Sequence, residues 1–188
     1  MLKNRIAHCG CGETKIEVLG NPDAVAVCSC LECQRRTGSV IGVSAYFSRA
    51  AIVSKSADTS EYTRVSEGGK RVDAFFCQSC GTTVWWEADF LTDHIGIAVG
   101  CFADPEFPQP LISVWEKTKH RWLKFSWPAL SCEEQTPTWF NKIVLAFSLP
   151  KLTHYLLSVF SFLKKHDKPI KEDECVLTKV ETILINRE

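Results

Sequence analysis

The stretch VDAFFCQSCGTTVWWE, residues 72–87, joins two extended segments through a pair of cysteines. Residues 72–76 and 82–87 are both rich in β-branched and aromatic side chains, a composition typical of β-strands. Upstream, the sequence EGGK at residues 67–70 separates residues 72–76 from another extended segment, residues 60–65, and its two glycines favour a hairpin turn. The second strand of this hairpin would deliver the first cysteine of the pair to the end of a sheet.

Further short extended segments occur on both sides of this stretch. Residues 14–18 alternate between polar and apolar side chains, and residues 24–27, 94–99 and 112–115 are short apolar or β-branched runs. The sequence therefore predicts a mainly β fold over residues 1–125.

The composition excludes some classes of function. The chain has 188 residues with 45% hydrophobic side chains, enough to bury a core, and its 22 basic and 22 acidic residues give a formal net charge of zero. We therefore expect no nucleic-acid partner. The first residues lack the apolar segment of a secretory signal, so we expect a cytoplasmic protein whose ten cysteines are thiols or metal ligands.

The last third of the chain has a different character. We predict one domain over residues 1–132 and a helical extension over residues 133–188, with a further helix at residues 171–188. An apolar helical face is formed by Leu152, Tyr155, Leu156, Val159, Phe160 and Leu163. Polar residues interrupt residues 139–163, so we expect no transmembrane span. The sequence does not indicate a role for the extension. A homo-oligomer is compatible with the sequence.

Seven of the ten cysteines fall into three tight groups, which are Cys9 and Cys11, then Cys28, Cys30 and Cys33, then Cys77 and Cys80. A structural zinc site needs four protein ligands, whereas a catalytic one commonly has three and an open position. The two cysteine pairs can together supply four thiolates, and the group of three would then form a separate site with one replaceable ligand.

Two alternatives stay open at this point. Iron–sulfur clusters use similar thiolate ligands. Zinc is the preferred metal for these cysteines, but an iron–sulfur cluster would also fit them. In addition, all seven cysteines would be structural if a remote residue completed the second site. The residues considered for that role are His8, His94, Cys101 and His120.

Four stretches carry a family resemblance: HCGCGETKIEV, CSCLECQRRTGS, FFCQSCGTTVWWE and VGCFADPEFPQPLISVWEKTKHRW. Together they resemble the glutathione-dependent formaldehyde-activating enzyme family, also called the GFA or CENP-V domain family, over residues 5–125. The resemblance implies a β-tent fold of twisted antiparallel sheets and two zinc ions per chain. It also implies structural zinc ligands Cys9, Cys11, Cys77 and Cys80, and catalytic zinc ligands Cys28, Cys30 and Cys33.

The same resemblance implies a carbon–sulfur lyase that joins glutathione to formaldehyde as S-hydroxymethylglutathione. Arg35, Arg36 and Thr37 follow the ligand loop closely enough to help bind an anionic thiol, although solvent-facing side chains are their default interpretation. Ser113 stands where one branch of the family has a histidine, and the sequence assigns no general acid or base. The alternative function is a non-enzymatic, zinc-stabilised binding module. The chain is neutral and has no basic flanking segment, so the enzyme is the preferred interpretation.

Overall fold

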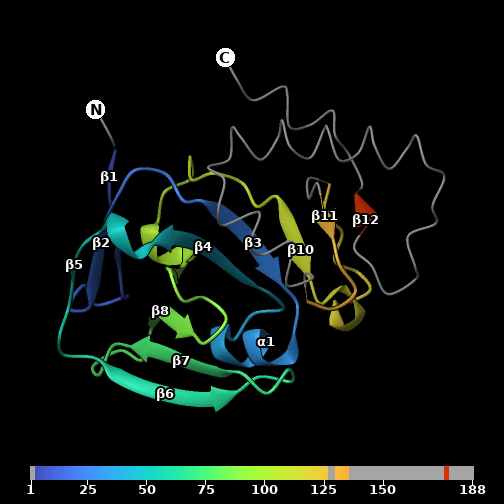
Figure 1. The fold of residues 1–188 in the computed structure, drawn as a ribbon, viewed down its shortest axis with the longest axis horizontal. Helices are drawn as coiled ribbons and strands as arrows, with labels where there is room; N and C mark the ends of the chain where they lie inside the picture. Colours follow the sequence, from blue (N-terminus) through green and yellow to red (C-terminus); the bar gives the residue numbers. More distant parts are fainter. Residues whose placement is uncertain (1–2, 127–129, 136–175, 178–188) are drawn as a thin grey trace. The chain divides into compact units, whose positions relative to one another are not determined.

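The computed structural model describes residues 3–126, 130–135 and 176–177 (Figure 1). The chain divides into two compact units, Met1–Pro22 with Val43–Pro108 and Asp23–Gly42 with Gln109–Glu188. The described residues form strands β1–β12, the single α-helix α1 and three short 3-10 helices, Arg49–Ala51, Val99–Phe102 and Glu116–Thr118. The predicted mainly β fold is confirmed.

The first unit contains a small antiparallel sheet of β1 (Asn4–His8), β2 (Lys15–Leu19) and β5 (Ile52–Lys55). Side chains along β1 and β2 alternate between buried and exposed, because successive residues of a strand point to opposite faces. The tight connection between β1 and β2 carries the first cysteine pair.

A second antiparallel sheet of the same unit contains the predicted hairpin. The strands follow the order β4 (Gly42–Ser48), β9 (His94–Ala98), β8 (Thr83–Ala88), β7 (Arg71–Phe76) and β6 (Ser60–Val65). In the turn between β6 and β7, the backbone N–H of Gly69 donates to the carbonyl of Ser66, and Gly69 has φ 73°, which suits glycine. Cys77 follows β7 directly, as predicted.

The two adjacent tryptophans of β8 lie on opposite faces of this sheet. Trp85 is 1% exposed and stacks on Phe75 with ring centroids 5.4 Å apart. The indole of Trp86 lies over Gly96, and its N–H donates to the hydroxyl of Ser44 at 3.2 Å.

The second unit is built on β10 (Ile112–Val114), which lies between β3 (Ala24–Cys28) and β11 (Leu130–Ser131). Both pairings of β10 are parallel, whereas all other strand pairs described above are antiparallel. The helix α1 (Leu31–Thr37) follows β3 after two residues. The group of three cysteines spans the end of β3, this connection and the first turn of α1.

The C-terminal region differs from the prediction at one described point. Val176–Leu177 forms strand β12, antiparallel to β11, where a helix over residues 171–188 was predicted. The backbone groups at the outer side of β11 provide hydrogen-bond partners for this segment, so sheet pairing overrides the helical pattern there. The apolar helical face of residues 152–163 lies outside the described residues, and the domain boundary at residue 132 stays a prediction. No helix in the described part of the chain is long and apolar enough to cross a membrane.

Candidate metal centres and substrate site

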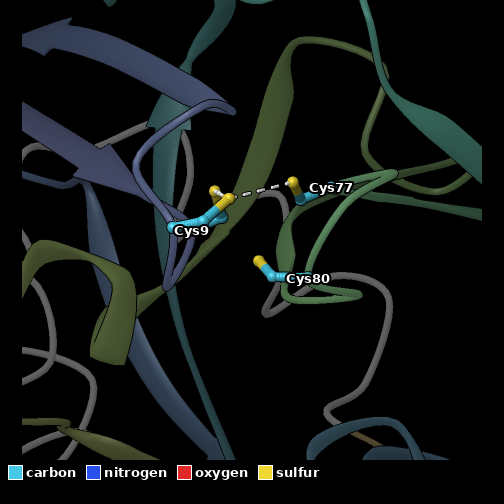
Figure 2. A group of neighbouring side chains, drawn as sticks. Cys9, Cys77 and Cys80 are labelled. Carbon is cyan, nitrogen blue, oxygen red and sulfur yellow. Dashed lines mark hydrogen bonds between the residues drawn. The ribbon is translucent and has the colours of Figure 1, made fainter.

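The first cysteine cluster joins two turns of the first unit. Cys9 and Cys11 lie in the turn after β1, and Cys77 and Cys80 lie in the turn after β7. The four Sγ atoms lie within 4.8 Å of one another, and Figure 2 shows the side chains of Cys9, Cys77 and Cys80 pointing toward one another. Cys9 and Cys77 are buried, whereas Cys11 and Cys80 are exposed at the rim. Four sulfurs at this separation can surround one ion.

Both turns are held in shape by their backbones. The N–H of Cys9 donates to the carbonyl of Thr14, and the N–H of Thr14 donates to Cys9 Sγ at 3.2 Å. In the second turn, the N–H of Cys77 donates to the carbonyl of Thr82. Gly81 has φ 72° there, a backbone conformation that other residues adopt at a cost. The protein backbone thus orients the sulfurs of both turns.

Ionisation is uneven within this cluster. Hydrogen bonds from the hydroxyl and backbone of Thr82 lower the pKa of Cys80 to about 5. The backbone of Glu13 lowers the pKa of Cys11, but hydrogen bonds with neighbouring sulfurs and burial outweigh this effect and raise the pKa to about 12. Full ionisation of all four thiols therefore requires a cation among them.

The second cluster lies where β3 ends and α1 begins. Cys28 is the last residue of β3, Cys30 is the N-cap of α1 and Cys33 lies in the first helical turn. Their Sγ atoms lie within 4.8 Å of one another, and all three residues are half-buried. No other histidine, cysteine, aspartate or glutamate of the described residues joins this group. A tetrahedral ion held here would keep one open position.

The three thiols also resist losing their protons together. Hydrogen bonds with Cys30 and Cys33, followed by burial, raise the pKa of Cys28 far above its ordinary value. The pKa of Cys33 is also raised: its hydrogen bond with Cys28 acts to lower it, but its hydrogen bond with Cys30 and burial outweigh that. A divalent cation would compensate the negative charge of three thiolates.

The helix α1 was not predicted from the sequence, although its ends carry recognisable signals. Cys30 Sγ accepts from the backbone N–H of Cys33 at 3.4 Å and so replaces the usual oxygen of an N-cap. Glu32 lies in the first turn, and Gly38 ends the helix with φ 64°. The signals at the start of the helix are hard to separate from the cysteine motif, because Cys30 and Glu32 lie inside it.

The three predicted substrate-binding residues have different surroundings in the structure. Arg35 forms an exposed ion pair with Glu32. The hydroxyl of Thr37 donates to the carbonyl of Cys33 at 2.8 Å and to that of Ile41 at 3.0 Å, so it serves the helix end. Of the three, Thr37 and Arg35 thus have local structural roles.

Arg36 lies beside the second cluster. A Cβ atom placed on Gly42 would lie 3.1 Å from Arg36 Nη2 and 3.2 Å from Cys33 Cβ, so the guanidinium and this cysteine share the space left open by the glycine. The charge of Arg36 also acts to lower the pKa of Cys33, against the effect of the other thiols. Arg36 is the predicted contact that the geometry favours.

A hydrogen-bond network missed by the sequence reasoning connects α1 with the segment after β10. Gln34 Nε2 donates to the carbonyl of Ser29 at 2.8 Å and to that of Thr118 at 3.2 Å. The hydroxyl of Thr118 donates to the same Ser29 carbonyl at 2.9 Å, and His120 Nε2 lies 3.2 Å from Gln34 Oε1. The one sequence signal for these contacts is the position of Gln34, which directly follows the last cysteine of the ligand motif.

A family comparison agrees with the cysteine pattern. The family model described as glutathione-dependent formaldehyde-activating enzyme (GFA) matches residues 4–118, a range that includes all seven clustered cysteines. The chain belongs to the GFA family. The predicted family membership is therefore confirmed.

Further comparisons add little to this GFA assignment. A crystal structure of a Rhodobacter sphaeroides protein, a structural-genomics target, is 24% identical with a TM-score of 0.42. The alignment covers 53% of this chain and 91% of that protein. No protein with a curated description matches the chain.

Ser113 has a defined partner within its own segment. This residue is fully buried on β10, and its hydroxyl donates to the carboxylate of Glu116. Glu116 also forms an ion pair with Lys119, whose pKa is lowered by burial and by the charge of Lys124. The hydroxyl of Ser113 is thus committed to this carboxylate.

The donor sets of both clusters fit zinc. Each consists of thiolate sulfur alone, a soft ligand set that zinc and iron–sulfur clusters accept. Backbone N–H groups also donate to sulfurs in both clusters, for example to Cys9 in the first and to Cys30 in the second, which stabilises the thiolate form. Two zinc ions per chain, one closed by four ligands and one with an open position, stay a prediction.

Proposed function

We propose that this GFA-family chain is a zinc-dependent carbon–sulfur lyase of the cytoplasm that acts on a thiol–aldehyde adduct such as S-hydroxymethylglutathione. The observation that carries the proposal is the half-buried cluster of Cys28, Cys30 and Cys33, which no further ligand joins among the described residues. The four-cysteine cluster would hold a second, structural zinc. The family description supports the thiol and aldehyde chemistry.

Catalysis at the second cluster needs a stabilised sulfur anion. Zinc held by Cys28, Cys30 and Cys33 would supply a Lewis acid with an open position. In the cleavage direction, the adduct's hydroxyl loses its proton, its O–H electron pair forms the carbonyl, and the C–S bond breaks with its electrons on sulfur. In the synthetic direction, the thiolate attacks the carbonyl carbon and the alkoxide takes up a proton.

Basic side chains near the cluster suit an anionic substrate. Glutathione carries two carboxylates, and a guanidinium can bind a carboxylate through two parallel hydrogen bonds. Arg36 lies beside Cys33, and within the described chain no hydrogen bond or ion pair occupies its guanidinium. We therefore assign Arg36 the role of binding a carboxylate of the thiol.

Matched cysteine substitutions test the proposal. Cys30→Ser should abolish adduct formation from glutathione and ¹³C-formaldehyde, followed by NMR, and should leave the fold intact. Cys77→Ser should lower the melting temperature, because metal binding is part of the folding free energy at a closed site. Zinc content by elemental analysis should fall from two ions to one in each variant.

The opposite pattern would reject the division of labour. If Cys30→Ser and Cys77→Ser were equally stable and equally active, neither cluster would have its assigned role. If the wild-type protein held zinc but bound the thiol without turnover, the chain would be a zinc-stabilised binding module.

A further inference from the structure

The side-chain amide of Gln34 has its orientation fixed by its neighbours. Its Nε2 group has two hydrogens, and two carbonyl oxygens, those of Ser29 and Thr118, lie 2.8 and 3.2 Å from it. The reversed amide would place its oxygen against both carbonyls, which have no hydrogen to donate. Gln34 Oε1 therefore faces His120 as an acceptor.

This orientation determines which nitrogen of His120 carries a hydrogen. His120 Nε2 lies 3.2 Å from Gln34 Oε1 and must donate, because the amide oxygen only accepts. In the neutral imidazole the other nitrogen, Nδ1, then has a free lone pair. The ring lies 5.5 Å from that of Trp122, and the residue is exposed. His120 can therefore reach a ligand in solution with a defined proton acceptor.

The anchor of His120 lies next to the second cysteine cluster in the sequence. Gln34 directly follows Cys33, and the Ser29 carbonyl that it contacts lies between Cys28 and Cys30. Thr118, two residues before His120, donates to the same carbonyl at 2.9 Å. Three hydrogen bonds thus tie residues 118–120 to residues 28–34, which carry the three thiols: Thr118 to Ser29, Gln34 to the carbonyl of Thr118, and His120 to Gln34.

We propose that His120 is the group that transfers the proton of the adduct's hydroxyl, and that Gln34 is the positioning residue that holds it in the Nε2–H tautomer. The inference rests on the proposed lyase function and assigns the acid and base that it requires. It also gives His120 a role other than the fourth metal ligand considered from the sequence.

The proton balance is simple in both directions. In cleavage, His120 Nδ1 takes the hydroxyl proton while the O–H electrons form the carbonyl and the C–S electrons move to sulfur. The products are the aldehyde, the thiolate and a protonated imidazole. In synthesis, the protonated imidazole returns this proton from Nδ1 to the alkoxide as the C–S bond forms, and no further reactant is consumed.

A spectroscopic experiment tests the positioning without any substrate. Ring ¹⁵N chemical shifts of the zinc-loaded protein, with His120→Asn identifying the signals, should show the Nε2–H tautomer in the neutral state. Gln34→Met removes the acceptor at similar size and should yield a mixture of tautomers. An Nδ1–H tautomer in the wild type, or no change in Gln34→Met, would overturn the role of Gln34.

Kinetics test the chemical role of His120. His120→Ala should lower kcat by roughly 10²- to 10⁴-fold, the range of general acid–base catalysis, with a small change in KM and with both zinc ions retained. Added imidazole should restore part of the rate, which a purely structural role would not allow. Arg121→Ala, an exposed change at the next residue, serves as the control and should retain wild-type kcat.

The outcomes separate the two proposals. An active wild type with an equally active His120→Ala, or a slow His120→Ala that imidazole does not rescue, would overturn the role of His120 and leave the lyase function standing. A wild-type protein without activity on the adduct would reject the lyase function and His120's part in it, while the ¹⁵N shifts would still decide whether Gln34 sets the tautomer.

Discussion

Gly96 shows how one missing side chain can fix the packing of a sheet face. The indole of Trp86 covers this residue on the neighbouring strand, and a Cβ atom there would lie 2.2 Å from Trp86 Cε2. Such a contact cannot be relieved by a flexible side chain, because the indole is rigid and its N–H is hydrogen-bonded to Ser44. Glycine at this position is therefore a steric requirement of β8 and β9.

We predict that Gly96→Ala destabilises the protein by about 1–3 kcal/mol, the usual cost of overpacking a well-packed site. Urea unfolding followed by tryptophan fluorescence measures the change. Gly100→Ala is a matched control, because nothing lies within 4 Å of its added Cβ and its φ is unremarkable. Equal stability of the two variants would mean that Trp86 moves freely over the sheet.

Arg36 and its neighbour Arg35 have different proposed roles, which substitutions can distinguish. We predict that Arg36→Ala raises the KM for the glutathione adduct roughly tenfold, the effect of losing about 1.4 kcal/mol of binding free energy. Arg35→Ala should have a much smaller effect, because its side chain pairs with Glu32 at the surface. A larger effect of Arg35→Ala, in steady-state kinetics with both zinc ions retained, would contradict this assignment.

At the scale of elements, much of the fold was predictable because strands leave a local signal. The predicted segments 60–65, 72–76 and 94–99 coincide with β6, β7 and β9 to within one residue at each end. The parallel pairing of β10 was not predictable, since it depends on a partner, β3, that lies far away in the sequence. The three residues of β10 do not indicate whether the neighbouring strand is parallel or antiparallel.

The candidate metal ligands were equally visible in the sequence, because close cysteine spacing is itself the signal. The contacts of Gln34 with Ser29 and His120 were not, because they depend on the local path of α1 and on a segment 86 residues away. The division of labour among Arg35, Arg36 and Thr37 also required three-dimensional contacts. Side-chain partners, unlike ligand spacing, leave no pattern in a single sequence.

An ion-pair cluster on β8 gives a prediction for pH. Burial acts to raise the pKa of Glu87, but hydrogen bonds from Arg49 and Lys55 outweigh it, so the pKa lies below its ordinary value. A carboxylate with a depressed pKa stabilises the fold above its unfolded-state pKa, and this contribution is lost as the pH falls through the folded-state pKa.

We therefore expect Glu87→Gln to cost roughly 1 kcal/mol near neutral pH, a value discounted because the pair is partly solvated. The difference from the wild type should shrink on acidification, as measured by urea unfolding at a series of pH values. Glu67→Gln, in the exposed turn before β7, is the control and should follow the wild type. A difference that stays constant with pH would show that charge is not its cause.

At the scale of the whole molecule, the two cysteine clusters belong to different compact units. The four-cysteine cluster lies in the unit of Met1–Pro22 and Val43–Pro108, and the three-cysteine cluster lies in the other. The first cluster joins turns from two sheets, whereas the second spans one junction between a strand and the helix that follows it. Their metals should therefore differ in both lability and effect on folding.

We predict that a chelator removes zinc in two stages. The ion with an open position should leave first, with loss of activity and little change in circular dichroism. The ion of the closed site should leave later, together with unfolding, since its binding free energy contributes to folding. Zinc release recorded with a colorimetric indicator, in parallel with circular dichroism, checks the order. Unfolding during the first stage would contradict it.

The different sequence separations within the clusters have a consequence for synthesis on the ribosome. Cys28, Cys30 and Cys33 emerge almost together, whereas Cys11 meets Cys77 only after a further 66 residues. The nascent chain can thus load its short-range thiol set early, when no long loop must close. The thiols of Cys9 and Cys11 stay open to oxidants and to the wrong metal until the β6–β7 hairpin has left the exit tunnel.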